Sequence, residues 1–131
     1  MTPEESEEAR RLLRAARADL RAAKVLAADA DQANEVVGFH AQQAVEKAIK
    51  TVLVASGVEI PYTHDLSFLL DVVAERAISV PRSVAQADWL TPWAVAARYG
   101  ASDAALDRET AVRDADDAVD WATGVVADAP S

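Results

Sequence analysis

The sequence of 131 residues contains no cysteine and only four glycines. Without cysteine, disulfide bonds, thiolate nucleophiles and zinc sites with cysteine ligands are all excluded. A chain of this length buries roughly two-thirds of its unfolded surface, so one domain over residues 1–131 needs no such cross-link to fold. Scarce glycine, abundant alanine and β-branched residues that do not alternate with polar ones predict an all-α fold.

Long apolar runs are also missing. No stretch reaches the roughly 18 apolar residues of a membrane-spanning helix. The acidic start of the chain lacks the basic and then apolar layout of a secretory signal. We therefore expect a cytoplasmic protein without a membrane segment. Its formal net charge of -9 makes it a poor general binder of nucleic acid, so any RNA contact must be local.

Five segments with apolar residues at helical spacing predict about five helices in an up-and-down bundle with a four-helix core. The expected bounds are 3–28 after a Thr2 cap, 35–56 before Gly57, 66–77 after a Thr63 or Asp65 cap, 82–99 with a kink or restart at Pro92, and 104–127. The residues expected to face the core are Ala9, Leu12, Leu13, Ala16, Leu20, Ala23, Ala27, Val37, Ala41, Ala44, Val45, Ala48, Ile49, Val52, Val112, Ala115, Val119, Ala122 and Val126.

A polar strip follows the second predicted helix. His40, Gln43, Lys47 and Lys50 fall within about 80° of one another on a helical wheel, opposite the apolar face. One interpretation is a surface that receives a phosphate or a carboxylate of a partner. The other is a solvated helix face without a ligand.

A row of cations follows the first predicted helix. Arg10, Arg14, Arg17, Arg21 and Lys24 lie within about 80° and extend over roughly 21 Å. A phosphate backbone could follow such a row. We favour pairing within the chain instead, because the last predicted helix supplies many acids, namely Asp107, Glu109, Asp114, Asp116, Asp117 and Asp120.

The remaining candidates have both structural and functional interpretations. Trp89 and Trp93 are expected to pack in the core, with a dimer or partner surface as the alternative. His64 and Asp65 begin the third helix, where Asp65 suits an N-cap. His64 either hydrogen-bonds the neighbouring joint or lies near His40 as a base or phosphate donor. Two histidines without a carboxylate at ligand spacing are weak support for a metal site, so we expect none.

The clearest local pattern is the segment FHAQQAVEKAIK at 39–50, followed by Thr63-His64-Asp65-Leu66 and then by Arg98-Tyr99. This order resembles the HEPN domain family over about residues 10–125. The resemblance implies a four-helix core with a fifth helix, usually dimeric, with a nucleotide- or RNA-related role. Many members pair with a minimal nucleotidyltransferase as two-gene toxin–antitoxin modules.

Other members of that family are metal-independent ribonucleases that use an arginine followed, after four to six residues, by a histidine. Arg98 matches the arginine, but Asp103, Ala104 and Ala105 occupy the positions where the histidine is expected. The ribonuclease motif is therefore incomplete. Arg98 could still neutralise a phosphate, but its partner for proton transfer is missing.

These observations give one main hypothesis and two alternatives. The main hypothesis is a homodimeric HEPN protein without a cofactor that works with a nucleotidyltransferase or binds a nucleotide or RNA, and that does not cut RNA by itself. The first alternative is a ribonuclease toxin with catalytic candidates Arg98, His40 and His64; the second is a purely structural dimeric scaffold. The proposed ligand-binding residues are His40, Gln43, Lys47, Lys50, Arg98 and Tyr99.

Overall fold

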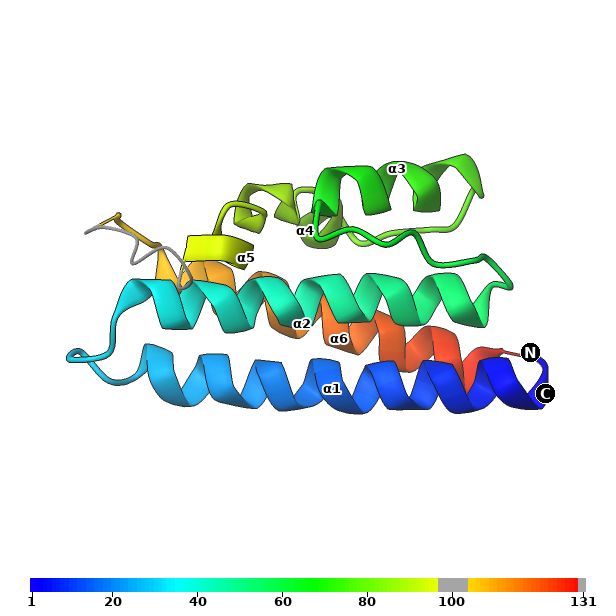
Figure 1. The fold of residues 1–131 in the computed structure, drawn as a ribbon, viewed down its shortest axis with the longest axis horizontal. Helices are drawn as coiled ribbons and strands as arrows, with labels where there is room; N and C mark the ends of the chain where they lie inside the picture. Colours follow the sequence, from blue (N-terminus) through cyan, green and yellow to red (C-terminus); the bar gives the residue numbers. More distant parts are fainter. Residues whose placement is uncertain (97–103, 130–131) are drawn as a thin grey trace.

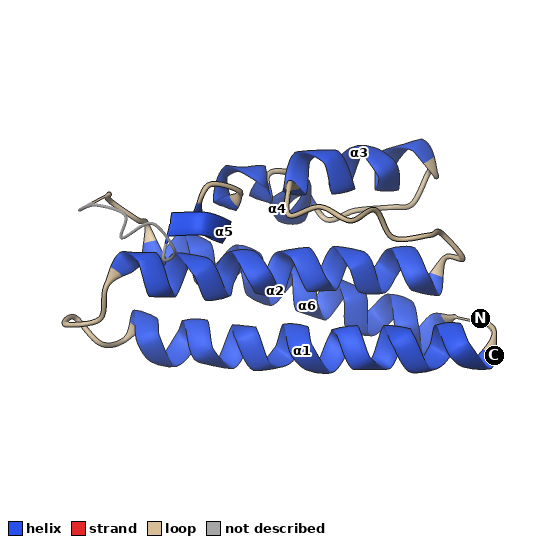
Figure 2. Cartoon of the chain, viewed as in Figure 1, coloured by secondary structure: helices blue, strands red, loops and turns tan. Residues whose placement is uncertain are grey.

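The structure, a computed structural model, describes residues 1–96 and 104–129. These residues form helices and loops without a strand, which confirms the all-α prediction (Figure 2). The elements are α1 (Pro3–Ala27), α2 (Asn34–Ala55), α3 (Leu66–Glu75), α4 (Arg82–Ala85), the 3-10 helix η1 (Ala87–Leu90), α5 (Trp93–Ala96) and α6 (Arg108–Asp128).

Helix α2 lies at the centre of the bundle. It contacts α1 and α6 along its length, and it also contacts α3, η1 and α5. In Figure 1, α1 lies on one side of α2, and the short helices α3, α4 and α5 lie on the other. The start of α1 and the end of α6 meet at one end of the bundle. A central helix surrounded in this way buries polar as well as apolar side chains.

Small residues line the contacts between the three long helices. Ala9, Ala16 and Ala23 of α1 are spaced by seven residues and are fully buried. Because alanine has no side chain beyond Cβ, the helix axes can approach closely. Every residue expected to face the core is buried except Ala27, Val112 and Val126, which are partly buried. Fully buried alanines also line α2 and α6, at positions Ala41, Ala44, Ala48, Ala111, Ala115, Ala118 and Ala122.

The helix ends follow local capping chemistry. Thr2 and Glu5 form the predicted capping box at the start of α1. Gly57, with φ of 75°, follows the end of α2. Asp65, and not Thr63, caps α3 by accepting hydrogen bonds from the backbone N–H groups of Ser67 and Phe68. The helix α3 ends at Glu75, two residues earlier than expected.

The last helix begins later than predicted. We expected it from residue 104, but α6 starts at Arg108 because Asp107 caps it and accepts a hydrogen bond from the Thr110 N–H. The Arg108 side chain then reaches back to the joint between α1 and α2. It donates to the carbonyl oxygens of Ala27 and Asp29 and to Asn34 Oδ1. This contact fastens the start of α6 to the other two long helices.

The prediction of one continuous helix over 82–99 is wrong within the described residues, because α4, η1 and α5 are separate short elements. The buried residues explain the break. Val84, Ala87, Leu90 and Trp93 are all buried at a spacing of three. Such a row stays on one face of a 3-10 helix but drifts around an α-helix. The chain therefore winds more tightly here, and the predicted restart at Pro92 is confirmed by α5 beginning at Trp93.

Acid should weaken the start of α6. Hydrogen bonds from Thr110 lower the pKa of Asp107 below its ordinary value of 3.8. When folding lowers the pKa of a carboxyl group, the group stabilises the folded state at pH values above its unfolded-state pKa. This stability is lost as the pH falls through the lower pKa of the folded state. We expect the stability difference between the wild type and Asp107→Asn to shrink over that acidic window, measured by urea denaturation at each pH. A difference independent of pH would contradict this assignment.

Candidate functional site

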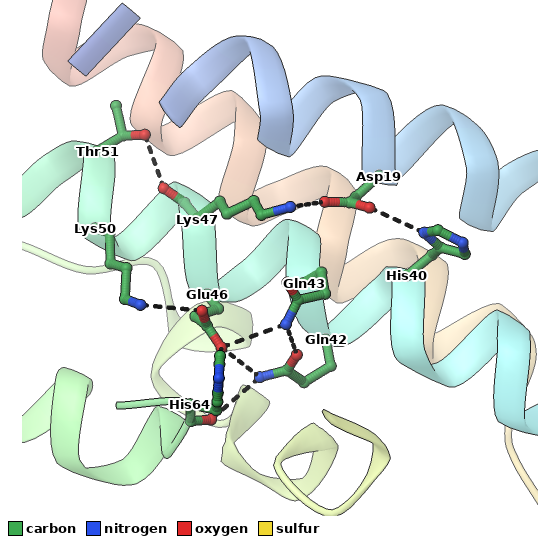
Figure 3. Close-up of polar contacts among 9 residues, drawn as sticks. All are labelled: Asp19, His40, Gln42, Gln43, Glu46, Lys47, Lys50, Thr51 and His64. Carbon is green, nitrogen blue, oxygen red and sulfur yellow. Dashed lines mark hydrogen bonds and ion pairs between the residues drawn. The ribbon is translucent and has the colours of Figure 1, made fainter. Parts of the chain in front are cut away.

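Polar side chains of α2 gather at two carboxylates, as Figure 3 shows. One is Asp19 of α1, and the other is Glu46 of α2 itself. Both carboxylates are largely buried, with side-chain exposures of 12% and 4%. We call the two groups the Asp19 group (Asp19, His40 and Lys47) and the Glu46 network (Gln42, Gln43, Glu46, Lys50 and His64).

The Asp19 group joins α1 to α2. His40 Nδ1 lies 2.9 Å from Asp19 Oδ1, and Lys47 Nζ lies 2.6 Å from Asp19 Oδ2. Each oxygen of the carboxylate thus contacts a different residue of α2. The two residues are seven positions apart, which is two turns along one face of the helix. His40 also packs its ring edge-to-face with Phe39, with ring centroids 5.4 Å apart. Asp19 therefore neutralises Lys47 and fixes the His40 ring.

The Glu46 network lies toward α3. Lys50 Nζ lies 3.0 Å from Glu46 Oε2, and His64 Nδ1 lies 2.8 Å from Glu46 Oε1. The amide nitrogens of Gln42 and Gln43 donate to Glu46 Oε1 at 3.0 and 3.4 Å. Within the described part of the chain, no buried side-chain nitrogen or oxygen lacks a hydrogen-bond partner. A buried carboxylate is tolerable here because its donors are numerous and one of them is a cation.

Gln42 physically connects the two motifs that lie far apart in the sequence. Its amide nitrogen donates to Glu46 and also to the carbonyl oxygen of His64, at 3.1 Å. The next two residues begin α3, with Asp65 as cap and the Leu66 N–H donating to Thr91 Oγ1. The segment FHAQQAVEKAIK and the segment beginning at Thr63 therefore meet through a shared hydrogen-bond network.

The predicted polar strip is divided between the two groups. His40 and Lys47 belong to Asp19, while Gln43 and Lys50 belong to Glu46. All four side chains are partly buried, so the strip is not a solvated helix face. Its cations bind carboxylates of the same chain. The other two proposed ligand-binding residues, Arg98 and Tyr99, lie outside the described residues.

The two histidines bind different carboxylates and lie on different sides of α2 (Figure 3). A carboxylate accepts a hydrogen bond, so each Nδ1 donates to its carboxylate, and in a neutral imidazole Nε2 is then the acceptor. The His64 side chain is 52% exposed, so its Nε2 can meet solvent or a ligand. Among the residues that the structure describes, no group of three or more histidine, aspartate or glutamate side chains could hold a metal ion.

The row of cations on α1 pairs only in part with α6. Lys24 Nζ lies 3.2 Å from Asp116 Oδ1, and Arg17 Nη2 donates to Thr123 Oγ1. Exposed ion pairs of this kind stabilise little. Arg10, Arg14 and Arg21 are exposed, and nothing in the described chain pairs with them. Within the described residues, pairing with an acid of α6 therefore holds for Lys24 alone among the five cations, and Arg17 instead bonds a hydroxyl.

The two tryptophans of the predicted fourth helix have different environments. Trp93 is buried and packs against Gly38 of α2, which confirms the core interpretation for this residue. Trp89 is 36% exposed, and its indole nitrogen donates to the buried carboxylate of Asp114 at 2.9 Å. Asp114 also accepts from Arg113. The core interpretation therefore holds for one tryptophan and not for the other.

These elements define a helical bundle whose central helix carries a buried polar network. The profile of the HEPN domain family matches residues 9–129, and the chain belongs to this family. No curated protein and no solved structure matches the chain. Within the described residues, no helix has the length and hydropathy that crossing a membrane requires.

Sequence reasoning missed both carboxylates at the centre of the site. Glu46 could have been found, because Gln42 and Lys50 lie four residues before and after it and share its helix face. Asp19 gave no such signal. Its contact with His40 and Lys47 depends on how α1 and α2 align, which spacing within one helix does not report.

Proposed function

We propose that this HEPN protein is a binding module that pairs with a separate nucleotidyltransferase, as the HEPN half of a toxin–antitoxin system, and acts as a homodimer. It does not cleave RNA by itself. One observation carries the proposal: the only two histidines, His40 and His64, precede Arg98, and no histidine follows it. The arginine and histidine pair of the ribonuclease members is therefore incomplete in this chain.

Charge balance at the described site bears on how strongly it can attract a phosphate. Lys47 is neutralised by Asp19, and Lys50 is neutralised by Glu46. A phosphate group would have to compete with these carboxylates, which would reduce its attraction to the strip. The proposed ligand site remains His40, Gln43, Lys47 and Lys50, together with Arg98 and Tyr99. In this proposal, Arg98 supplies the positive charge that the strip itself no longer offers.

A ribonuclease remains the second candidate because of one specific contact. Glu46 accepts from His64 Nδ1, and in the neutral imidazole Nε2 of this half-exposed side chain would be the free base. A base oriented by a carboxylate is one requirement of acid–base catalysis. In this alternative, expression arrests growth, and His64→Gln relieves the arrest.

Purified protein distinguishes the two candidates. We expect no cleavage when the purified 131-residue protein is incubated with total RNA in the presence of a metal chelator. Metal-free cleavage that disappears in Arg98→Ala would refute the main proposal. If the same cleavage also disappears in His64→Gln but persists in His40→Gln, the second candidate is correct.

Partner and ligand binding need a separate measurement. Affinity purification from the native cell should recover a nucleotidyltransferase, and light scattering of the purified protein should give twice the mass of one chain. Thermal shift with nucleotides tests the ligand site, because a ligand at a hundredfold excess over its dissociation constant stabilises by about 2.7 kcal/mol. A monomer that gains no stability and recovers no partner would contradict the proposal and also the scaffold alternative.

A further inference from the structure

A surface groove lies away from both carboxylate groups, between the C-terminal end of α2, residues 79–81 and the last turns of α6. It has a volume of about 710 Å³. Val80, Trp121 and Val125 give it an apolar lining. The Trp121 ring is held in place because its indole nitrogen donates to the Ser79 carbonyl oxygen at 3.0 Å. This hydrogen bond fixes one wall of the open groove.

Gly124 lines this groove, and nothing in the described chain requires glycine at this position. It is inside α6, four residues before its end, where glycine weakens a helix relative to alanine. Among the described glycines only Gly57 has a positive φ, so no special backbone conformation requires Gly124. A Cβ atom added at Gly124 would meet nothing within 4 Å. The missing side chain leaves room on the outside of the helix, where a second molecule can approach the backbone.

The charges beside the groove indicate the chemistry of that molecule. Asp120 and Asp128 line the groove, are exposed, and have no ion-pair partner in the described part of the chain. A second copy docked symmetrically would bring the same aspartates together, and like charges facing each other oppose binding. A partner with cations beside an apolar ridge would neutralise these charges and fill the lining.

We propose that this groove binds a basic amphipathic helix of a partner protein, with apolar side chains over Trp121 and Val125 and lysines or arginines beside Asp120 and Asp128. Gly124 lets the partner helix approach the backbone of α6. The inference goes beyond the proposed function, because it does not depend on the partner being a nucleotidyltransferase or on the state of the Arg98 site.

A designed peptide tests the groove with the 131-residue protein. The probe is a fluorescein-labelled helical peptide of 14 residues with leucine on one face and lysine on its flanks, and the matched probe carries glutamate in place of every lysine. We expect the lysine peptide to bind and the glutamate peptide to bind at least tenfold more weakly, measured by fluorescence anisotropy. In NMR spectra, the indole N–H resonance of Trp121 should shift, while those of Trp89 and Trp93 stay in place.

Three variants test the named residues. Asp120→Asn with Asp128→Asn, and separately Gly124→Leu, should each weaken the lysine peptide at least tenfold. We expect Gly124→Leu to fold, because a Cβ atom at this position meets nothing within 4 Å. The control, Asp31→Asn with Glu109→Gln, removes the same charge at the other end of the bundle and should change binding less than twofold.

Several outcomes would overturn the proposal. They are no binding of the lysine peptide, equal weakening by the Asp31 and Glu109 control, and unchanged binding by Gly124→Leu. A fall in the molecular mass of the free protein in Gly124→Leu would instead assign the groove to a second copy of this chain. None of these results depends on RNA cleavage, so the proposed function and the groove can fail separately.

Discussion

Replacing Glu46 with alanine is expected to lower the free energy of unfolding by about 3 kcal/mol, because it removes one member of a buried ion pair. The Lys50 side chain is only 14% exposed, so its ammonium group would be left with little water and no carboxylate. Gln42, which is fully buried, would also lose an acceptor. Urea denaturation followed by circular dichroism measures the change, with an unchanged slope if the folded state is kept.

Two comparisons separate this effect from the loss of any glutamate. Glu75→Ala on α3 removes an exposed side chain that has no partner in the described chain, and it should change stability by less than about 0.5 kcal/mol. Glu46→Leu combined with Lys50→Met replaces both charges by apolar groups and should recover much of the loss. If Glu46→Ala costs no more than Glu75→Ala, the Glu46 network does not stabilise the bundle.

The same variant should loosen one particular region. The network joins α2 to His64, directly before the cap of α3. Without it, amide hydrogen exchange in residues 58–66 should accelerate more than exchange in the middle of α1. Equal acceleration in both regions would mean that Glu46 supports the whole bundle and not the junction between the two motifs.

The long helices could be predicted because their information is local. Residues such as Leu13, Ala16 and Leu20 repeat at the helical period, and Thr2 with Glu5 marks the first cap in the sequence itself. Segment 82–96 failed for a physical reason. Its buried residues recur every third position, and the chain follows this spacing by tightening into η1. Burial against α2 and α6 overrides the α-helical preference of the segment.

The site was predictable only where its contacts lie within one helix. His40, Gln43, Lys47 and Lys50 lie on α2 as the helical spacing predicts, but they are partly buried and divided between two carboxylates. The partners of these side chains could not be predicted from α2 alone, because Asp19 belongs to α1 and His64 belongs to the loop before α3. Such contacts depend on helix alignment, which the apolar spacing of a single helix leaves open.

Alanine at Gly38 and alanine at Gly124 are expected to change stability in opposite directions, although both substitutions remove a glycine from a helix. At Gly38, the added Cβ would lie 2.5 Å from Trp93 Cε3 and 2.6 Å from Trp93 Cδ2. These atoms belong to the fixed part of a buried ring, so the ring must leave its place in the core. We expect Gly38→Ala to lower the free energy of unfolding by about 2 kcal/mol, as overpacked cores do.

Gly124→Ala is the matched control, because its Cβ enters open space and only the helix preference changes. It should raise the free energy of unfolding by about 0.5 to 1 kcal/mol. Urea denaturation of both variants gives the comparison, and Trp93→Leu should recover part of the loss at Gly38, since the two residues are in contact. A Gly38→Ala variant as stable as Gly124→Ala would contradict the close packing of Trp93 on Gly38.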